Sequence, residues 1–166
     1  MSAITEPATT LLERSRQMHH PFCFTCSGEN PLGLGLRFRL LADGSVESEV
    51  DCDALYQGYR GILHGGVATS ILDAAMTSCL FSHGRVGVTA EMAVQFRHPI
   101  AVGSTVMARA RIARSRPPLY LAEGELLQDN VVMARAEGKF ADMPDGFEGR
   151  LANCHAAVGP CGSRDQ

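Results

Sequence analysis

Six stretches of the chain show the spacing of apolar residues that is typical of β-strands. Leu34, Leu36 and Phe38 repeat with a period of two, which predicts a strand with one buried face. The pair Asp43-Gly44 comes soon after and favours a hairpin turn into the next strand. The predicted strands cover residues 34–41, 46–50, 86–96, 104–113, 119–127 and 131–140.

A single long helix is predicted between the second and the third strand. It runs from about Gly65 to Ser82, and Gly84 is its end signal. Residues 61–84 carry one charge, Asp73, although the chain's content of 20% charged residues would place roughly five there. A helix this apolar packs against a sheet. Two strands, one helix and four strands therefore predict an α+β domain.

The 166 residues fit one domain that is long enough to bury a core. We expect a flexible or loosely helical N-terminal arm over residues 1–19, a folded domain over 20–142 and a C-terminal tail over 143–166. The formal charge of −3 provides no basic field, so we expect neither a nucleic acid nor a membrane as partner. The first twenty residues have no apolar run of the kind found in signal peptides, and we expect a cytoplasmic location.

The lone carboxylate of the helix, Asp73, is the first candidate for chemistry. Helical spacing places Thr69, Ser70 and Thr77 beside it, which makes a narrow stripe of small hydroxyl groups. A water-facing side of an amphipathic helix is the alternative, but such a side usually carries Lys, Glu or Arg. A carboxylate that is partly removed from water suits a general base or a nucleophile.

The start of the helix is the second candidate. His64, Gly65 and Gly66 stand there, and two glycines let a ligand approach the backbone closely. The N–H groups of a first helical turn lack intrahelical partners and can hold a developing oxyanion. A glycine turn with a capping or packing histidine is the simpler alternative.

The spacing of the two candidates constrains how they cooperate. Gly65 and Asp73 are eight residues apart, which is about 12 Å along a helix. One carbonyl group cannot contact both within a single chain. If they share a site, they come from different subunits of a symmetric dimer.

Two segments resemble the hotdog-fold acyl-CoA thioesterases of the phenylacetate-pathway type, a branch that includes the mammalian thioesterase superfamily members. They are Gly-Ile-Leu-His-Gly-Gly-Val-Ala-Thr-Ser-Ile-Leu-Asp-Ala-Ala at residues 61–75 and Val-Gly-Val-Thr-Ala-Glu-Met-Ala-Val-Gln-Phe-Arg-His-Pro at residues 86–99. The resemblance covers roughly residues 23–140. It implies the hotdog fold, an antiparallel sheet wrapped around one long central helix, with subunits paired edge to edge into a homodimer or a homotetramer.

The resemblance also implies an activity, hydrolysis of the thioester of a small or medium acyl-CoA or of an acyl-carrier substrate. The Gly65 N–H would polarise the thioester carbonyl, and His64 would shape the loop before the helix. Asp73 of the facing subunit would act as nucleophile or as base for water. Thr89 falls where relatives carry a Ser or Thr that assists the carboxylate. No metal or other cofactor is implied, because coenzyme A enters as part of the substrate.

Coenzyme A is expected at the subunit interface, with basic residues near its phosphates. The alternative for the arginines is a solvated charge cluster beside a turn. Six residues are predicted to contact the substrate or its coenzyme A: Gly58, Gly66, Thr69, Arg97, Arg114 and Arg116.

The position six residues before His64 departs from the family pattern. Some relatives carry Asn or Gln there, which helps to hold the attacking water or the carbonyl group. This chain has Gly58, so that contribution is missing or comes from Gln57 or Tyr59.

Strict alternation argues against contact between Thr89 and Asp73. Along the third predicted strand it places Val88 with Met92 on one face and Thr89 with Glu91 on the other. Only the resemblance, and not the pattern, therefore brings Thr89 to the carboxylate.

The cysteines are expected to be free thiols in a reducing compartment rather than a disulfide framework. The motif Cys23-Phe-Thr-Cys26 follows His20, and further potential zinc ligands stand near the C-terminus. That second group lacks tight metal-ligand spacing, so we favour a metal-free loop whose thiols pack against the first strand. The six cysteines are Cys23, Cys26, Cys52, Cys79, Cys154 and Cys161, and His155 follows Cys154.

Two other functions fit a hotdog domain. A non-enzymatic protein would bind acyl-CoA or another small ligand and release no thiol. A dehydratase acting on a hydroxyacyl thioester uses a different arrangement of His with Asp or Glu, which this sequence lacks. Thioester hydrolysis is therefore the preferred hypothesis.

Overall fold

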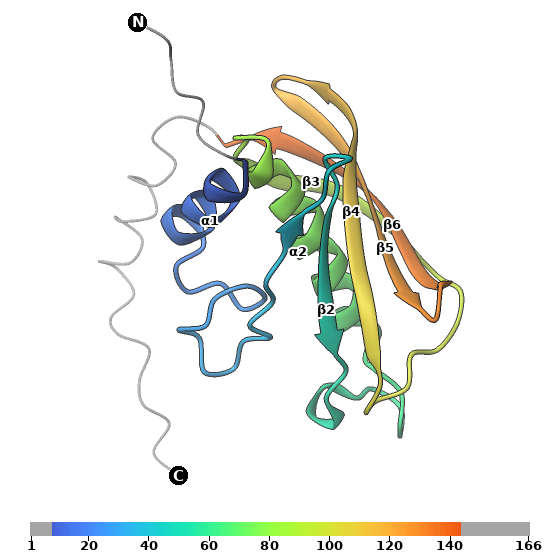
Figure 1. Cartoon of the computed structure of the whole chain (residues 1–166). Coiled ribbons are helices and arrows are strands. Elements are labelled where there is room, and N and C mark those ends of the chain that lie inside the picture. The colour runs from blue at the N-terminus through green and yellow to red at the C-terminus, as the bar shows by residue number, and fades with distance from the viewer. Residues whose placement is uncertain (1–7, 144–166) are drawn as a thin grey trace, which may run out of the picture.

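A six-stranded antiparallel sheet curves around the helix α2 (Gly65–Ser82), as Figure 1 shows. The computed structural model describes residues 8–143. The strand order is β1-β2-β4-β5-β6-β3, so β3 forms one edge of the sheet. This architecture confirms the α+β class and the central helix. The strands are β1 (Arg39–Leu40), β2 (Val46–Asp51), β3 (Gly87–Phe96), β4 (Thr105–Arg116), β5 (Leu119–Gln128) and β6 (Val131–Asp142), and a short 3-10 helix η1 spans Ala54–Tyr56.

The two ends of α2 lie where local signals predict them. His64 precedes the helix in an extended conformation, with φ −63° and ψ 131°. Gly84 follows it with a φ of 66°, a left-handed conformation that favours glycine. Most of the helix is buried, including Leu72 and Met76. No helix among the described residues has the length and the apolar character needed to cross a membrane.

Small residues on the sheet let α2 approach it closely. A Cβ atom at Gly124 would lie 3.3 Å from Leu72 Cδ2, and one at Gly138 would lie 3.1 Å from Met76 Sδ. Larger side chains at these positions would push the helix away from the strands. The small residues that face α2 on β4, β5 and β6 are Ala108, Ala110, Ala122, Gly124, Ala134, Ala136 and Gly138.

The tight hairpins of the sheet follow from turn residues. Asp129 and Asn130 connect β5 to β6 with φ angles of 50° and 63°, the geometry of a two-residue turn between twisted strands. In the β1–β2 turn, the Asp43 carboxylate accepts a hydrogen bond from the Ser45 N–H at 3.0 Å. Gly44 adopts a φ of 82° there, so the hairpin predicted from Asp43-Gly44 is confirmed.

Part of the segment expected to be a flexible arm is a regular helix, α1 (Ala8–His19). Its Leu12 is only 4% exposed, and the helix packs on α2. The few apolar residues of α1 show no clear period, so the sequence pattern alone does not reveal a helix that depends on tertiary packing. The predicted tail, except Met143, lies outside the described residues.

The first predicted strand, over residues 34–41, is paired with β2 only at Arg39–Leu40. Gly35, with a φ of 62°, interrupts the extended backbone. The preceding loop takes the hydrogen bonds instead, because Leu34 N–H donates to the Phe24 carbonyl and Leu36 N–H to the Thr25 carbonyl, both at 2.9 Å. Alternation thus correctly predicts that Leu34, Leu36 and Phe38 face the core. It does not predict that the segment bonds to the preceding loop.

We expect Gly138→Val to lower the free energy of unfolding by about 1–3 kcal/mol, because overpacking a core costs that amount. A Cβ atom there would lie 3.1 Å from Met76 Sδ on α2 and 2.7 Å from Phe140 Cε2 on β6. The matched control is Glu137→Val on the same strand, where the side chain is exposed, and it should change stability by less than about 0.5 kcal/mol. Urea unfolding followed by circular dichroism measures both. Equal stability of the two variants would show that α2 does not approach the sheet this closely.

Candidate functional site

At the start of α2, one backbone N–H group has no hydrogen-bond partner among the described residues. His64 Nδ1 accepts a hydrogen bond from the Gly66 N–H at 2.9 Å. The His64 carbonyl accepts from Val67 at 2.9 Å and from Ala68 at 3.1 Å. Among the described residues, the Gly65 N–H has no hydrogen-bond partner. His64 is therefore a helix cap, and Gly65 presents a free N–H at the positive end of the helix dipole.

The loop before α2 is held by its own contacts. A Cβ atom at Gly58 would lie 3.1 Å from His64 Cδ2, so glycine lets this loop pack on the histidine. The Gln57 side chain accepts a hydrogen bond from the Gly61 N–H at 3.1 Å. The Gln57 oxygen is thus occupied within the loop, while Tyr59 is 83% exposed. The Gln57 amide nitrogen and the Tyr59 hydroxyl are the groups that could replace the missing Asn or Gln at this position.

A surface groove of about 350 Å³ lies beside the free N–H of Gly65. Leu63, Ile100 and Phe96 contribute apolar walls, and Arg97 contributes a charge at its rim. Phe96 comes close to the helix start, since a Cβ atom at Gly65 would lie 3.5 Å from its ring. Sequence reasoning does not single out Phe96. The signal that could have found it is a large aromatic residue at the end of an edge strand, where it is 57% exposed.

Asp73 lies in the middle of α2 and contacts β3. The Thr89 hydroxyl donates a hydrogen bond to Asp73 Oδ1 at 2.7 Å. Asp73 is half-buried, as are Thr69 and Ser70 in the preceding turn, while Thr77 is buried. The stripe of small hydroxyl groups is therefore not a fully solvated helix face.

A β-bulge explains why strict alternation fails for Thr89. Thr89 pairs with Phe140, and Glu91 pairs with the next residue, Lys139, so Ala90 is an extra residue in β3. Such an extra residue moves every earlier side chain to the opposite face. Thr89 therefore shares the α2 face with the buried Phe140. The prediction that Val88 shares a face with Met92 is wrong for the same reason.

The three predicted phosphate contacts do not lie together in one chain. Arg97 is near Gly65, is exposed, and donates to the Gln95 side chain at 3.3 Å. Arg114 and Arg116 are exposed at the far end of β4, where their cross-strand partners are Leu121 and Leu119. Those two arginines stand on the face of the sheet turned away from α2.

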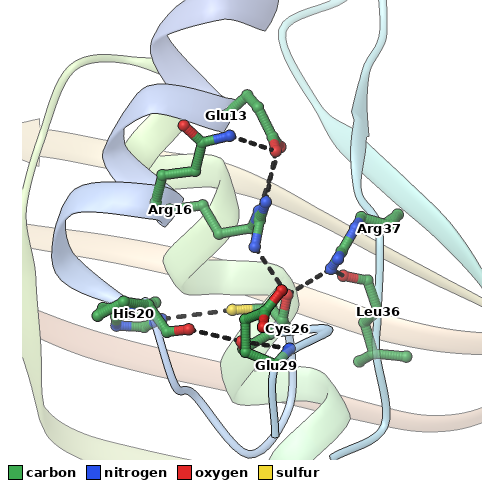
Figure 2. A network of polar contacts seen from close by, with 10 residues as sticks. Glu13, Arg16, His20, Cys26, Glu29, Leu36 and Arg37 are labelled. Carbon is green, nitrogen blue, oxygen red and sulfur yellow. Dashed lines mark hydrogen bonds and ion pairs between the residues drawn. The ribbon is translucent and has the colours of Figure 1, made fainter.

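The loop between α1 and β1 carries the Cys-x-x-Cys motif and is held by two arginines (Figure 2). Arg16 of α1 and Arg37 both donate to the Cys26 carbonyl, Arg16 at 3.1 Å. The neighbouring Cys26 thiol holds the pKa of the Cys23 thiol well below its usual value, with a smaller contribution from His20. The same contact raises the pKa of Cys26.

The other described cysteines belong to the core. Burial raises the pKa of Cys79 to about 11 and also raises the pKa of Cys52. All four described cysteines, these two with Cys23 and Cys26, are free thiols. Cys154, His155 and Cys161 lie outside the described residues.

An antiparallel sheet around one long helix is the architecture of a hotdog domain, and comparison with known proteins agrees. The family described as the thioesterase superfamily matches residues 60–117. The acyl-coenzyme A thioesterase THEM4 of Rattus norvegicus is 29% identical over 106 residues, which are 61% of this chain and 44% of that protein. This chain therefore spans less than half the length of that curated relative.

Solved structures show the same fold. The conserved protein PA5202 of Pseudomonas aeruginosa is 30% identical, with a TM-score of 0.60 over 66% of this chain and 90% of that one. The PaaI protein from the phenylacetic acid degradation operon of E. coli has a TM-score of 0.68 over 82% of this chain and 96% of its own, at 18% identity. This chain belongs to the thioesterase superfamily, as its resemblance predicts.

We expect His64→Ala to lower the free energy of unfolding by about 1 kcal/mol, because α2 loses the side chain that caps the Gly66 N–H. His64→Asn should keep most of that stability, since Asn is a good N-cap residue. Urea unfolding of the two variants beside the wild type measures the difference. An equal loss in both variants would mean that His64 stabilises the fold by packing and not by capping.

Proposed function

We propose that this chain hydrolyses the thioester bond of an acyl-CoA or acyl-carrier substrate with a small or medium acyl group. The observation that carries the proposal is the unpartnered N–H of Gly65 beside a groove, in a family whose members include an acyl-coenzyme A thioesterase. A free N–H at a helix start is suited to a carbonyl oxygen that becomes negatively charged.

In the proposed reaction, the thioester carbonyl oxygen accepts a hydrogen bond from the Gly65 N–H. Asp73 then either removes a proton from an attacking water or attacks the carbonyl carbon itself. The resulting tetrahedral oxyanion collapses, the carbon–sulfur bond breaks, and the coenzyme A thiolate takes up a proton. Water hydrolyses the anhydride if Asp73 is the nucleophile. The Thr89 hydroxyl occupies Oδ1 and thereby orients the carboxylate so that Oδ2 faces the reaction.

The proposed site requires two copies of the chain. Gly65 and Asp73 are separated by about 12 Å along one helix, so one carbonyl group cannot meet both. The edge strand β3 supports pairing, because it is ten residues long and mostly exposed. A long open edge strand is a ready surface for a second chain. Pairing through β3 as a homodimer, or as a dimer of dimers, would bring Asp73 of one copy toward Gly65 of the other.

We place coenzyme A along the groove at Gly65, at the boundary between the two copies. Arg97 is the phosphate contact with the strongest support, because it stands at the rim of that groove. Gly66 and Thr69 continue the same helix face toward the acyl group. Arg114 and Arg116 would reach the phosphates only across the subunit boundary. Hydrolysis by this route needs no metal or redox cofactor.

Asp73→Asn is expected to lower kcat by about 10²–10⁴-fold, the usual contribution of a general acid or base, with the oligomer intact. The measurement is thiol release from short, long, branched and aryl acyl-CoAs, together with size-exclusion chromatography. The matched control is Asp51→Asn, since Asp51 accepts a comparable hydrogen bond from Thr105 at 2.9 Å outside the site. Unchanged turnover in Asp73→Asn would remove Asp73 from the mechanism. Ligand-dependent melting without thiol release from any substrate would favour a binding protein.

Gly65→Pro tests the oxyanion donor with little disturbance of the backbone. Proline is favoured at the first position of a helix and has no N–H. His64 already has the extended conformation that a residue before proline needs. We expect kcat to fall by about 10²–10³-fold in Gly65→Pro. Gly65→Ala keeps the N–H and adds only a methyl group, so it should lose less activity than Gly65→Pro.

Mixed oligomers test whether the site is shared. Gly65→Pro and Asp73→Asn chains, unfolded together and refolded, should regain part of the activity, because a hybrid dimer contains one site with both wild-type residues. Refolded separately, each variant should keep only its strongly reduced activity. Native mass spectrometry confirms that hybrids form. Hybrids without any activity would contradict a site built from two subunits.

A further inference from the structure

One histidine and two cysteines converge far from the proposed catalytic site. His20 follows α1 directly, and Cys23 and Cys26 lie on the loop that leads to β1. One ring nitrogen of His20 and the two Sγ atoms all lie within 4.8 Å of one another. In Figure 2 the sulfur of Cys26 points at the ring of His20, and these two atoms are 3.5 Å apart. None of these three side chains has a role in the proposed hydrolysis.

The separation of these atoms fits the ligands of a tetrahedral zinc ion. Zinc binds sulfur at about 2.3 Å and imidazole nitrogen at about 2.0–2.1 Å, so two such ligands stand about 3.5 Å apart at a tetrahedral angle. The distance between His20 Nδ1 and Cys26 Sγ has that value. Two thiolates and an imidazole form a soft donor set, which favours Zn²⁺ over Mg²⁺ or Ca²⁺.

We propose that His20, Cys23 and Cys26 supply three ligands to a Zn²⁺ ion, with a water molecule in the fourth position. Two thiolates neutralise the ion, so the complex carries no net charge into a place where Cys26 is already buried. The His-x₂-Cys-x₂-Cys spacing brings all three ligands from seven consecutive residues. The sequence alone favours a metal-free loop because the potential ligands near the C-terminus lack tight metal-ligand spacing.

The surroundings hold the ligands in place before a metal arrives. Arg16 and Arg37 clamp the Cys26 carbonyl from two sides, and the Ser27 hydroxyl donates to the Pro21 carbonyl at 2.6 Å. The ring of His20 packs edge-on against Phe81, with ring centroids 5.0 Å apart. Fixed outer contacts of this kind orient metal ligands and raise affinity.

The proposed ion would fix the loop that follows α1, and His20 of that loop packs on the C-terminal end of α2. The His20 ring packs against Phe81, which lies near the C-terminal end of α2. Gly65 is the first residue of the same helix. Sixteen residues of helix separate the two, which is about 24 Å. The zinc would therefore act on stability and not on the thioester. Its presence does not depend on the proposed hydrolysis.

Metal content is the first test. Full-length protein purified under reducing conditions without chelator should contain one equivalent of zinc per chain, as measured by inductively coupled plasma mass spectrometry. Cys23→Ser, Cys26→Ser and His20→Asn should each lose most of it. Cys52→Ala is the matched control, because Cys52 is a buried thiol away from the loop, and it should keep the full equivalent.

Cobalt substitution of the wild type tests the site without relying on variants that fold poorly. Metal-free, reduced protein titrated with CoCl₂ should develop thiolate-to-cobalt charge-transfer absorption that saturates at one equivalent, and ZnCl₂ should abolish it. A chelator should lower the melting temperature of the wild type but not of Cys26→Ser. No cobalt spectrum, or a reduced protein that readily forms a Cys23–Cys26 disulfide while binding no zinc, would overturn the proposal.

Discussion

The close contact between α2 and the small-residue face of the sheet is the constraint on which the rest of the structure depends. Gly124 and Gly138 leave room for Leu72 and Met76, so the helix lies against the strands without an intervening layer of large side chains. That contact fixes both the position and the rotation of the helix. With the rotation fixed, Asp73 faces β3 and Gly65 opens onto the groove.

One helix thus carries both proposed catalytic groups, but the two groups cannot contact the same carbonyl within one chain. Its first N–H is a dipole-strengthened donor, and its central carboxylate is held by Thr89. The rigid spacing of a helix keeps these groups apart within one chain. The open edge strand β3 would allow two sheets to pair. Such pairing would bring Gly65 of one copy toward Asp73 of the other. The proposed zinc loop lies at the other end of the same helix, where it would strengthen the packing of α1.

Local signals in the sequence predict most of the fold. The helix predicted from Gly65 to Ser82 has the same bounds in the structure. Its start and end depend on residues next to it in the chain, which the sequence shows directly. The turns at Asp43-Gly44 and Asp129-Asn130 are equally local. Prediction fails where pairing with a distant strand decides the outcome. The extra residue Ala90 in β3 is defined only against β6, and residues 34–38 bond to the Cys loop and not to β2.

The sequence by itself determined most of the strands, the helix α2 with the glycines at its start, and the lone Asp73. Each of these depends on propensity and spacing along a few residues. Only the tertiary structure decided which groups meet. The bulge turns Thr89 to Asp73, Phe96 comes beside Gly65, and His20 comes to Cys26. The physical reason is that these contacts depend on strand register and on the packing of α1 and α2, which no local pattern encodes.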